Sequence, residues 1–386
     1  MNATLQCLSQ ILNLADYFKY HERINSVIDN LKRKNCLTKS FKILIENLWP
    51  TKGNKYNKKE NRGKNSNNEY FIPEEFKKKI SKMNPLFEGV QANDAKDLVN
   101  FIIMTLHEEL NKYKANTSNN GNLPNVEIDQ TNQFLVLNNF VNNFSKENQS
   151  IISDIFYGVS HTVTKCSQCI IDKHNYEAFF FLNFPLEEVR KYKLQLIQNQ
   201  NMILSSQNNM NMNINQNWMS NQIIQQNLNK INLLQKNLVN IFDCFEYNQK
   251  QESFTGENAM YCNTCKMQLP STYTTYLYSA PSILILVLNR GTGIQFKIKL
   301  EFYTKLNLTN FFQAKQANEN IIYDLIGIVT HMGKSGSSGH FIATCKSPID
   351  GLWYQYNDDL AFKIEDFNNQ ILNYAMPYIL FYQKKS

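Results

Sequence analysis

Apolar residues in the first part of the chain recur every three or four positions, the period of a helix with one buried face. The series runs through Leu5, Leu8, Leu12, Ala15, Phe18, Ile24, Ile28, Leu31, Phe41, Leu44 and Leu48. It predicts helices over the first 45 residues. Another helix is predicted over DAKDLVNFIIMTLHEELNKY, where Asn93 or Asp94 can supply the N-terminal cap.

From Ser153 onward the pattern changes to short alternating or continuous apolar runs, which are typical of strands. These runs are IFYGVSHTVTKC, NYEAFFFLNFPL, TYTTYLYSA, SILILVLNR, IIYDLIGIVT, HFIATCKS, LWYQYN and YILFYQK. The last of them predict a substantial antiparallel sheet near the C-terminus. Because helices come first and strands later, the fold class predicted is α+β.

Two polar segments interrupt these patterns. Residues 197–235 are rich in Asn and Gln and offer little apolar material, so we expect a disordered insertion there. Lysines gather between Lys52 and Lys79, and the few aromatic residues among them are not interleaved in a way suited to base stacking. We interpret that stretch as a solvated loop and expect no nucleic-acid partner.

Composition places the chain among globular proteins. Its 386 residues are 42% hydrophobic, enough for a packed core, and one extended domain with inserted loops can hold them all. The formal net charge is +7, but no run of ~20 apolar residues is present to span a bilayer. The first residues lack the basic region of a secretory signal. We therefore expect an intracellular protein, cytoplasmic or nuclear, with no membrane partner.

Paired cysteines give the strongest chemical signal. Cys166 and Cys169 form one CxxC motif, and Cys262 and Cys265 form another. Two residues between thiolates let both sulfurs face one ion, and two such turns complete a tetrahedral Cys₄ zinc site. The alternative is a set of thiols without metal, because 92 residues separate the motifs. Loop closure costs grow only logarithmically with length, however, so structural Zn²⁺ is the prediction.

A second signal lies near the C-terminus. His331 opens a glycine-rich loop that ends in Gly339 and His340, and Asn357 and Asp358 follow one strand later. A short return strand would bring either residue to the imidazole, as the base and its orienting partner are placed in a thiol protease. Taken alone, a histidine followed 17 residues later by an asparagine is a weak signal, and a structural histidine is the commoner explanation.

Several ordered motifs resemble the catalytic domain of ubiquitin-specific proteases. MNATLQCLSQ resembles the segment that follows the family's active-site cysteine, and FEGVQANDAKDLVNFIIMTLHEELN resembles its glutamine-aspartate box. DIFYGVSHTVTKCSQC, FTGENAMYCNTCK and APSILILVLNR resemble the finger strands and the strand beyond them. IGIVTHMGKSGSSGHFIATCKSPIDGLWYQYNDD and YAMPYILFYQKK resemble the histidine box and closing strand.

The resemblance implies a papain-like thiol protease fold, filling one domain over residues 1–386, that removes ubiquitin from proteins. It implies a helical thumb at 1–150 with a Lys/Asn-rich loop at 51–70, zinc-bearing fingers at 151–185 and 240–280, and a β palm at 281–386. Ubiquitin and ubiquitinated proteins are the implied partners.

Site roles follow from the same resemblance. His340 is similar to the general base, Asn357 to the residue that orients it, and Asp358 to an auxiliary acid. Asp94 is similar to the aspartate that holds ubiquitin's C-terminal tail, and Gly339 with the loop from His331 to Ser338 resembles a mobile loop over the cleft. Ala92 and Asn93 depart from the family's glutamine pair, Asp97 stands for its usual glutamate, and Leu98 stands where an aromatic residue is common.

The nucleophile and the asparagine that helps stabilise the oxyanion would precede Met1. Cys7 lies on an apolar helix, Cys36 in a polar link, Cys244 in an expected buried turn and Cys345 on the strand of His340, so none has the context of a nucleophile. Two readings stay open: a sequence that starts downstream of the true cysteine, or a catalytically inactive ubiquitin binder.

Overall fold

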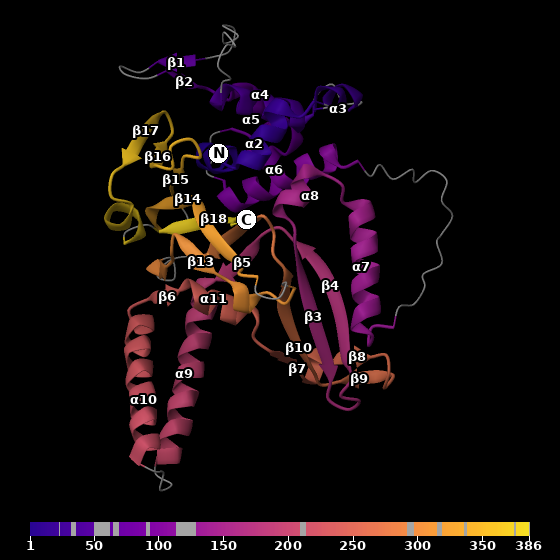
Figure 1. Ribbon diagram of the computed structural model, residues 1–386, viewed down its shortest axis with the longest axis vertical. Coiled ribbons are helices and arrows are strands. Elements are labelled where there is room, and N and C mark those ends of the chain that lie inside the picture. The colour runs from indigo at the N-terminus through magenta and orange to yellow at the C-terminus, as the bar shows by residue number, and fades with distance from the viewer. Residues whose placement is uncertain are drawn as a thin grey trace.

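The computed structural model describes residues 1–22, 24–31, 36–49, 62–64, 69–89, 93–112, 129–208, 214–291, 297–314, 319–335, 338–373 and 376–385. Its first part is helical, as the period of apolar residues predicts. The helices are α1 (Asn2–Ser9), α2 (Leu12–Tyr20), α3 (Ile24–Asn30), α4 (Leu37–Leu48), α5 (Glu74–Met83), α6 (Ala95–Leu110), α7 (Gln133–Glu147) and α8 (Ile151–Phe156). Figure 1 shows most of them gathered at one end of the molecule.

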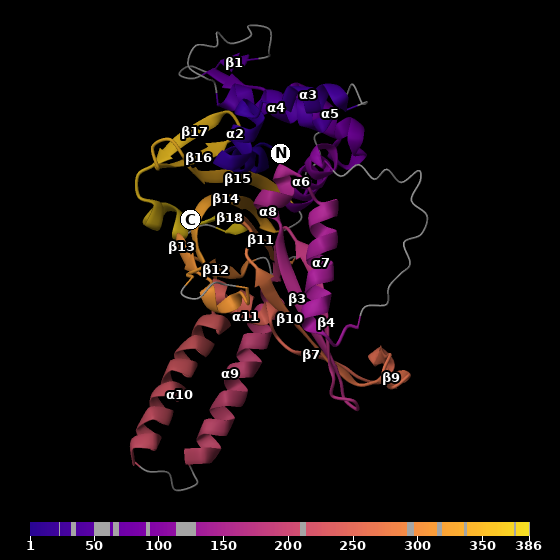
Figure 2. The ribbon, with the colours of Figure 1, turned by 45° about the vertical axis from the view of Figure 1, so that its right-hand side comes forward.

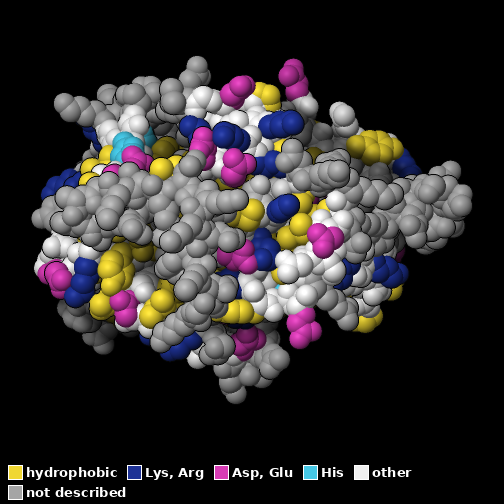
Figure 3. Space-filling view, turned by 90° about the horizontal axis from the view of Figure 1, so that it is seen from above, with side chains coloured by type: hydrophobic (Ala, Val, Ile, Leu, Met, Phe, Trp, Pro, Cys, Tyr) yellow, Lys and Arg dark blue, Asp and Glu magenta, His cyan; other side chains and the backbone are white. Residues whose placement is uncertain are grey.

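The Lys/Asn-rich loop lies mostly outside the described residues. Within it, β1 (Arg62–Lys64) pairs with β2 (Glu69–Phe71) as a small antiparallel hairpin. Charged side chains of both signs are interspersed over the described part of the upper face (Figure 3). Residues 113–128, which follow α6, also lie outside the described residues.

A large, mainly antiparallel sheet forms the centre of the molecule. Its order is β17-β16-β15-β14-β18-β11-β5, with β13 beside β14. The bounds are β5 (Leu182–Pro185), β11 (Ile283–Asn289), β13 (Lys305–Asn307), β14 (Ile322–Ser335), β15 (Ser338–Lys346), β16 (Trp353–Asn357), β17 (Leu360–Ile364) and β18 (Pro377–Lys384). The sequence did not predict the parallel pairing of β5 with β11.

Both faces of this sheet are covered, which explains the continuous apolar run of β11. Ile283, Ile285 and Val287 join a core with helices α1, α2, α6 and α8. Leu284 and Leu286, which point to the opposite face, join a second core with residues of α9 and α11. Successive residues of a strand point to opposite faces, so a strand between two cores has no polar position.

A second sheet extends away from the first (Figure 2). Its order is β4-β3-β10-β7, built from β3 (Gly158–Cys166), β4 (Asp172–Phe179), β7 (Glu252–Phe254) and β10 (Ser271–Ser279). A small hairpin of β8 (Met260–Cys262) and β9 (Met267–Leu269) lies beside its far end. Helix α7 runs along β4 and brings Phe140 against Tyr176.

The expectation of disorder over residues 197–235 was wrong for its described part. Helix α9 (Leu186–Asn208) and helix α10 (Ile214–Gln235) run side by side and project from the body as an arm (Figures 1 and 2). Asn and Gln disfavour a core of their own, but sparse apolar residues at the root suffice: Ile197 and Leu234 are buried against the large sheet's second core.

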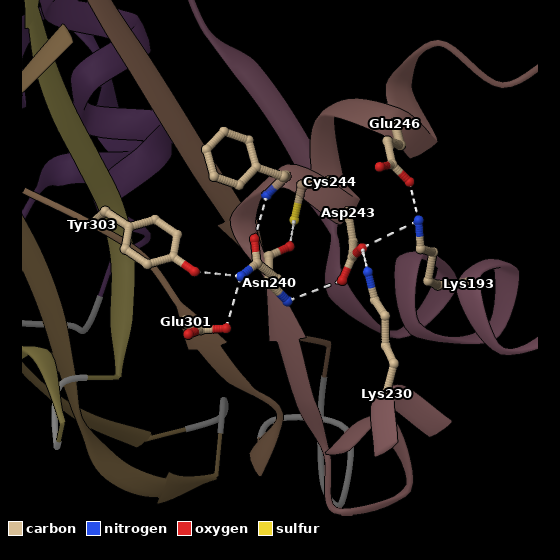
Figure 4. Close-up of polar contacts among 9 residues, drawn as sticks. Lys193, Lys230, Asn240, Asp243, Cys244, Glu246, Glu301 and Tyr303 are labelled. Carbon is tan, nitrogen blue, oxygen red and sulfur yellow. Dashed lines mark hydrogen bonds and ion pairs between the residues drawn. The ribbon is translucent and has the colours of Figure 1, made fainter. Parts of the chain in front are cut away.

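A buried ion cluster ties the arm to the body (Figure 4). Asp243 of α11 (Ile241–Asn248) is only 1% exposed, and its Oδ1 lies 2.7 Å from Lys230 Nζ of α10 and 3.4 Å from Lys193 Nζ of α9. Asn240, at the end of β6 (Leu238–Asn240), caps α11 and donates from Nδ2 to Glu301 of β12 (Lys299–Glu301). One carboxylate therefore organises three helices.

Short helical turns complete the described fold at Pro85–Phe87, Gly256–Asn258, Thr309–Phe311 and Asn368–Leu372. Among the described helices, none has the length and apolarity that crossing a membrane requires.

Candidate functional site

His340 meets Asn357 and Asp358 at the edge of the large sheet. Strands β15 and β16 pair as neighbours, which brings Asn357, at the end of β16, within reach of the imidazole. The His340 Nε2 atom lies 2.6 Å from Asn357 Oδ1. Because an amide oxygen only accepts, Nε2 carries the proton and Nδ1 keeps a lone pair. The ring, 46% exposed, is thus oriented with a basic nitrogen available.

Asp358 supports the same ring from the turn between β16 and β17. Its backbone adopts φ 52°, a left-handed conformation that Asp tolerates better than most residues. Its Oδ2 lies 3.6 Å from His340 Nε2. The carboxylate therefore stands beside the nitrogen that carries the proton, where it favours a transient imidazolium.

The N-terminus of α1 meets this group. Asn2 Nδ2 donates to Asp358 Oδ1 over 3.0 Å. Burial lowers the pKa of the Met1 α-amino group, and the charge of Asp358 opposes that shift. A helix N-terminus carries positive partial charge and stabilises a thiolate placed there. The sequence did not predict that Asn2 would take part.

The cysteines outside the CxxC motifs are poor nucleophiles. Cys7 and Cys345 lie in the core with their sulfurs 3.6 Å apart. Cys345 is five residues from His340 on one strand and so points to the opposite face. Burial raises the pKa of Cys345 well above its usual value, and burial does the same for Cys244. Cys36, expected in a polar link, is buried at the cap of α4, and burial raises its pKa too.

The four CxxC thiols converge on one point. Sulfurs of Cys166, Cys169, Cys262 and Cys265 all lie within 4.8 Å of one another. Cys169 Sγ and Cys262 Sγ are 3.8 Å apart. A tetrahedron with metal–sulfur bonds of ~2.3 Å has edges of about 3.8 Å, so the donor set fits an ion such as zinc.

Both CxxC turns close in the same way. Ile170 and Lys266, each directly after the second cysteine, have φ 57° and φ 58°. Their N–H groups donate to the carbonyls of Cys166 and Cys262. Backbone N–H groups, chiefly that of Cys265, lower the pKa of the Cys262 thiol to about 6, and Lys173 Nζ lies 3.7 Å from its sulfur. These contacts favour the thiolate that a metal requires.

Comparison with known proteins decides the family. Residues 1–382 match the family described as ubiquitin carboxyl-terminal hydrolase. The chain belongs to this family.

Its relatives include ubiquitin carboxyl-terminal hydrolase 2 of Bos taurus, 23% identical over the whole chain and 53% of the relative. Ubiquitin carboxyl-terminal hydrolase 15 of Rattus norvegicus is 30% identical over 51% of the chain and 19% of the relative. The chain thus spans about half, or less, of these relatives' length.

Solved structures show the same fold. Ubp8-containing SAGA DUB modules, one bound to monoubiquitin and one to ubiquitin aldehyde, match the whole chain with TM-scores of 0.61 and 0.62. The matches cover 66% and 67% of those chains at 19% and 18% identity. The α+β fold predicted from the sequence is therefore confirmed.

Asp94 lies at the start of α6. Its Oδ1 accepts from Lys96 N over 2.8 Å and caps the helix, as predicted. Its Oδ2 accepts from the Tyr378 hydroxyl over 2.6 Å. No local sequence pattern indicated this role for Tyr378, although the residue lies in the segment YAMPYILFYQKK. Ala92 and Asn93 stand where the family has a glutamine pair. Ala92 lies outside the described residues, and no side-chain contact of Asn93 is described.

His331 and Gly339 pack directly on each other. A Cβ at Gly339 would overlap the His331 ring, so this position requires glycine for steric reasons. The described part of the loop continues strands β14 and β15 to Ser335 and from Ser338. His331 is buried while His340 is exposed, so only His340 presents its ring at the surface.

Proposed function

We propose that this chain supplies the base, its orienting residues and the ubiquitin-binding surfaces of a cysteine-type deubiquitinase. The reaction is cleavage of the isopeptide bond after ubiquitin's C-terminal glycine. The carrying observation is that His340, Asn357 and Asp358 gather at the N-terminus of α1. A residue joined to Met1 would enter the site beside them, which supports a nucleophilic cysteine located just upstream.

His340 then takes the thiol proton at Nδ1 and returns it to the leaving lysine amine, while Asn357 holds Nε2–H. Asp358 stabilises the imidazolium. Asp94 and Gly339 line the path of ubiquitin's C-terminal tail, and buried His331 packs against Gly339 and supports it there. The helices before residue 150 act as the thumb, the sheet of β3 and β10 as the fingers, and the large sheet as the palm. Ubiquitin as partner is supported by solved neighbours that are described as bound to it.

We further propose that Cys166, Cys169, Cys262 and Cys265 hold one structural Zn²⁺. The ion would fix the fingers and take no part in proton transfer, since the four thiols leave no coordination position open.

Hydrolysis of a fluorogenic ubiquitin C-terminal substrate tests the function. Residues 1–386 alone should bind ubiquitin without cleaving it, because the buried cysteines cannot act. A version extended upstream with Gly-Asn-Thr-Cys and an aromatic residue should cleave, and the same extension with Ala for Cys is the matched control. This pairing also tests the alternative of an inactive ubiquitin binder, which the extension would not activate.

Within the active version, His340→Ala should lower kcat by about 10³-fold or more with ubiquitin binding preserved. Asn357→Ala should cost less, because Asp358 still lies near Nε2. Robust hydrolysis by the unextended chain, lost on mutating Cys7 or Cys36, would contradict the proposal.

A further inference from the structure

Asp94 is held from two sides, and each carboxylate oxygen receives one donor. Lys96 N–H bonds Oδ1, and the Tyr378 hydroxyl bonds Oδ2 at 2.6 Å. A carboxylate has about four acceptor sites, so capacity remains on both oxygens for donors of a ligand. Removing the hydroxyl would leave the cap intact but free Oδ2 to turn.

Tyr378 is itself fixed by the start of β18. The carbonyl of Pro377, its neighbour, accepts from Arg290 Nε over 2.8 Å. Arg290 is 2% exposed and also donates to the carbonyl of Ile298. The phenol ring therefore has little freedom relative to the large sheet.

The same ring contacts the strand that carries His340. Tyr378 lies 5.3 Å from Phe341, between ring centroids, and Phe341 lies 4.9 Å from His331. Tyr378 thus links Asp94, the N-cap of α6, to Phe341, the residue next to His340 on β15. Helix and sheet belong to opposite sides of the proposed cleft.

A tyrosine hydroxyl suits this task better than a cation would. It orients the carboxylate without cancelling its charge, so Asp94 stays an acceptor for cationic or N–H donors. Burial, and then the bond to Asp94, raises the pKa of Tyr378, so the hydroxyl remains a donor throughout the neutral range.

We propose that Tyr378 is the positioning residue that aims Asp94 at the extended C-terminal tail of the substrate, and that it sets the spacing between tail and His340. This inference rests on the proposed function. It assigns a role to a residue that makes no contact with the proton-transfer group itself.

The test is calorimetric binding of intact ubiquitin and of ubiquitin lacking its last C-terminal residues. Tyr378→Phe should weaken the binding of intact ubiquitin about five- to tenfold, the scale expected for a mispositioned hydrogen bond. The binding of truncated ubiquitin should not change. Asp94→Asn, which keeps a capping side chain, should weaken intact ubiquitin similarly. Once Asp94→Asn is present, adding Tyr378→Phe should have no further effect, because the two act as one unit.

Tyr382→Phe is the matched control. Tyr382 lies on β18, the strand of Tyr378, but away from Asp94. The substitution removes the hydrogen bond that the Tyr382 hydroxyl donates to the Tyr303 carbonyl over 2.8 Å. It should lower the Tm comparably without changing ubiquitin binding. If ubiquitin binding depends on the tail but Tyr378→Phe does not change it, the role of Tyr378 is overturned and the proposed function is not. No ubiquitin binding by the unmodified chain would overturn the proposed function, and this inference with it.

Discussion

Two polar clusters lie where parts of the chain project from the body: the thiol cluster of the four CxxC cysteines, and the arm root, where Asp243 pairs with Lys193 and Lys230. They differ in how their residues are spaced along the sequence. Cys166, Cys169 and their two partners come from turns with a fixed local spacing. Asp243 pairs with Lys193 and Lys230, which lie on two separate helices. No regular spacing in the sequence predicts this contact. Metal ligands that lie in short motifs can be predicted from the sequence. An ion cluster whose members meet only in the folded chain cannot.

The largest effect should come from breaking the thiol cluster. Cys262→Ser should reduce bound zinc from about one equivalent to nearly none and loosen the β8–β9 hairpin. Structural zinc contributes roughly 10–16 kcal/mol in isolated zinc-finger peptides, so one lost ligand is severe. Metal analysis and hydrogen exchange would measure both effects. Cys36→Ala, buried outside the cluster, should keep its zinc; full zinc content in Cys262→Ser would refute the site.

The arm root should be the next most sensitive place. Asp243→Ala leaves two lysines without their shared carboxylate, and Lys193 is 9% exposed, so unfolding free energy should fall by about 3–5 kcal/mol. Urea denaturation would measure it. Lys191→Ala is the control, because Lys191 is exposed and its pairing with Glu187 should matter little. A loss below about 1 kcal/mol for Asp243→Ala would show that the cluster is dispensable.

Backbone strain at the CxxC turn offers a smaller test. Ile170 is β-branched, 67% exposed and left-handed, a conformation that costs roughly 1–2 kcal/mol. Ile170→Gly should relieve this strain at a cost of about 0.5–1 kcal/mol of added chain entropy. The net gain in the zinc-loaded protein should reach up to ~1.5 kcal/mol. Ile171→Gly, next to it but without positive φ, should lose stability. Equal losses at both positions in thermal unfolding would argue against strain.

The arm tip should matter least. Asn227 Nδ2 donates to Asn201 Oδ1 over 2.7 Å, so α9 and α10 are adjacent there. Replacing residues 202–226 by a short glycine turn should change unfolding free energy by no more than about 0.5 kcal/mol. Removing all of 197–235 should instead cost several kcal/mol, since it takes away buried Ile197 and Leu234. Equal stability of the two deletions in urea would contradict this division.

Sequence alone predicted the fold class and the elements that position the site. Helix α6 with its cap at Asp94, the strands, and the gathering of His340 with Asn357 follow from local period, capping and spacing. Composition failed over 197–235, because a few apolar residues at a helix root outweigh an Asn/Gln-rich tip. Asn2 and Tyr378 were missed for a related reason: their roles come from contacts with residues distant in sequence, which no local pattern encodes.

The contact of Asn2 with Asp358 has a consequence for the life of the nascent chain. These residues are 356 positions apart, and α1 buries Leu5, Cys7 and Leu8 in a core shared with the large sheet. During synthesis α1 can pack against α2 and α6, but its contacts with β14, β15 and β16 form only after those strands leave the ribosome. The group formed by Asn2, His340, Asn357 and Asp358 is therefore completed last, and an unfinished polypeptide lacks it.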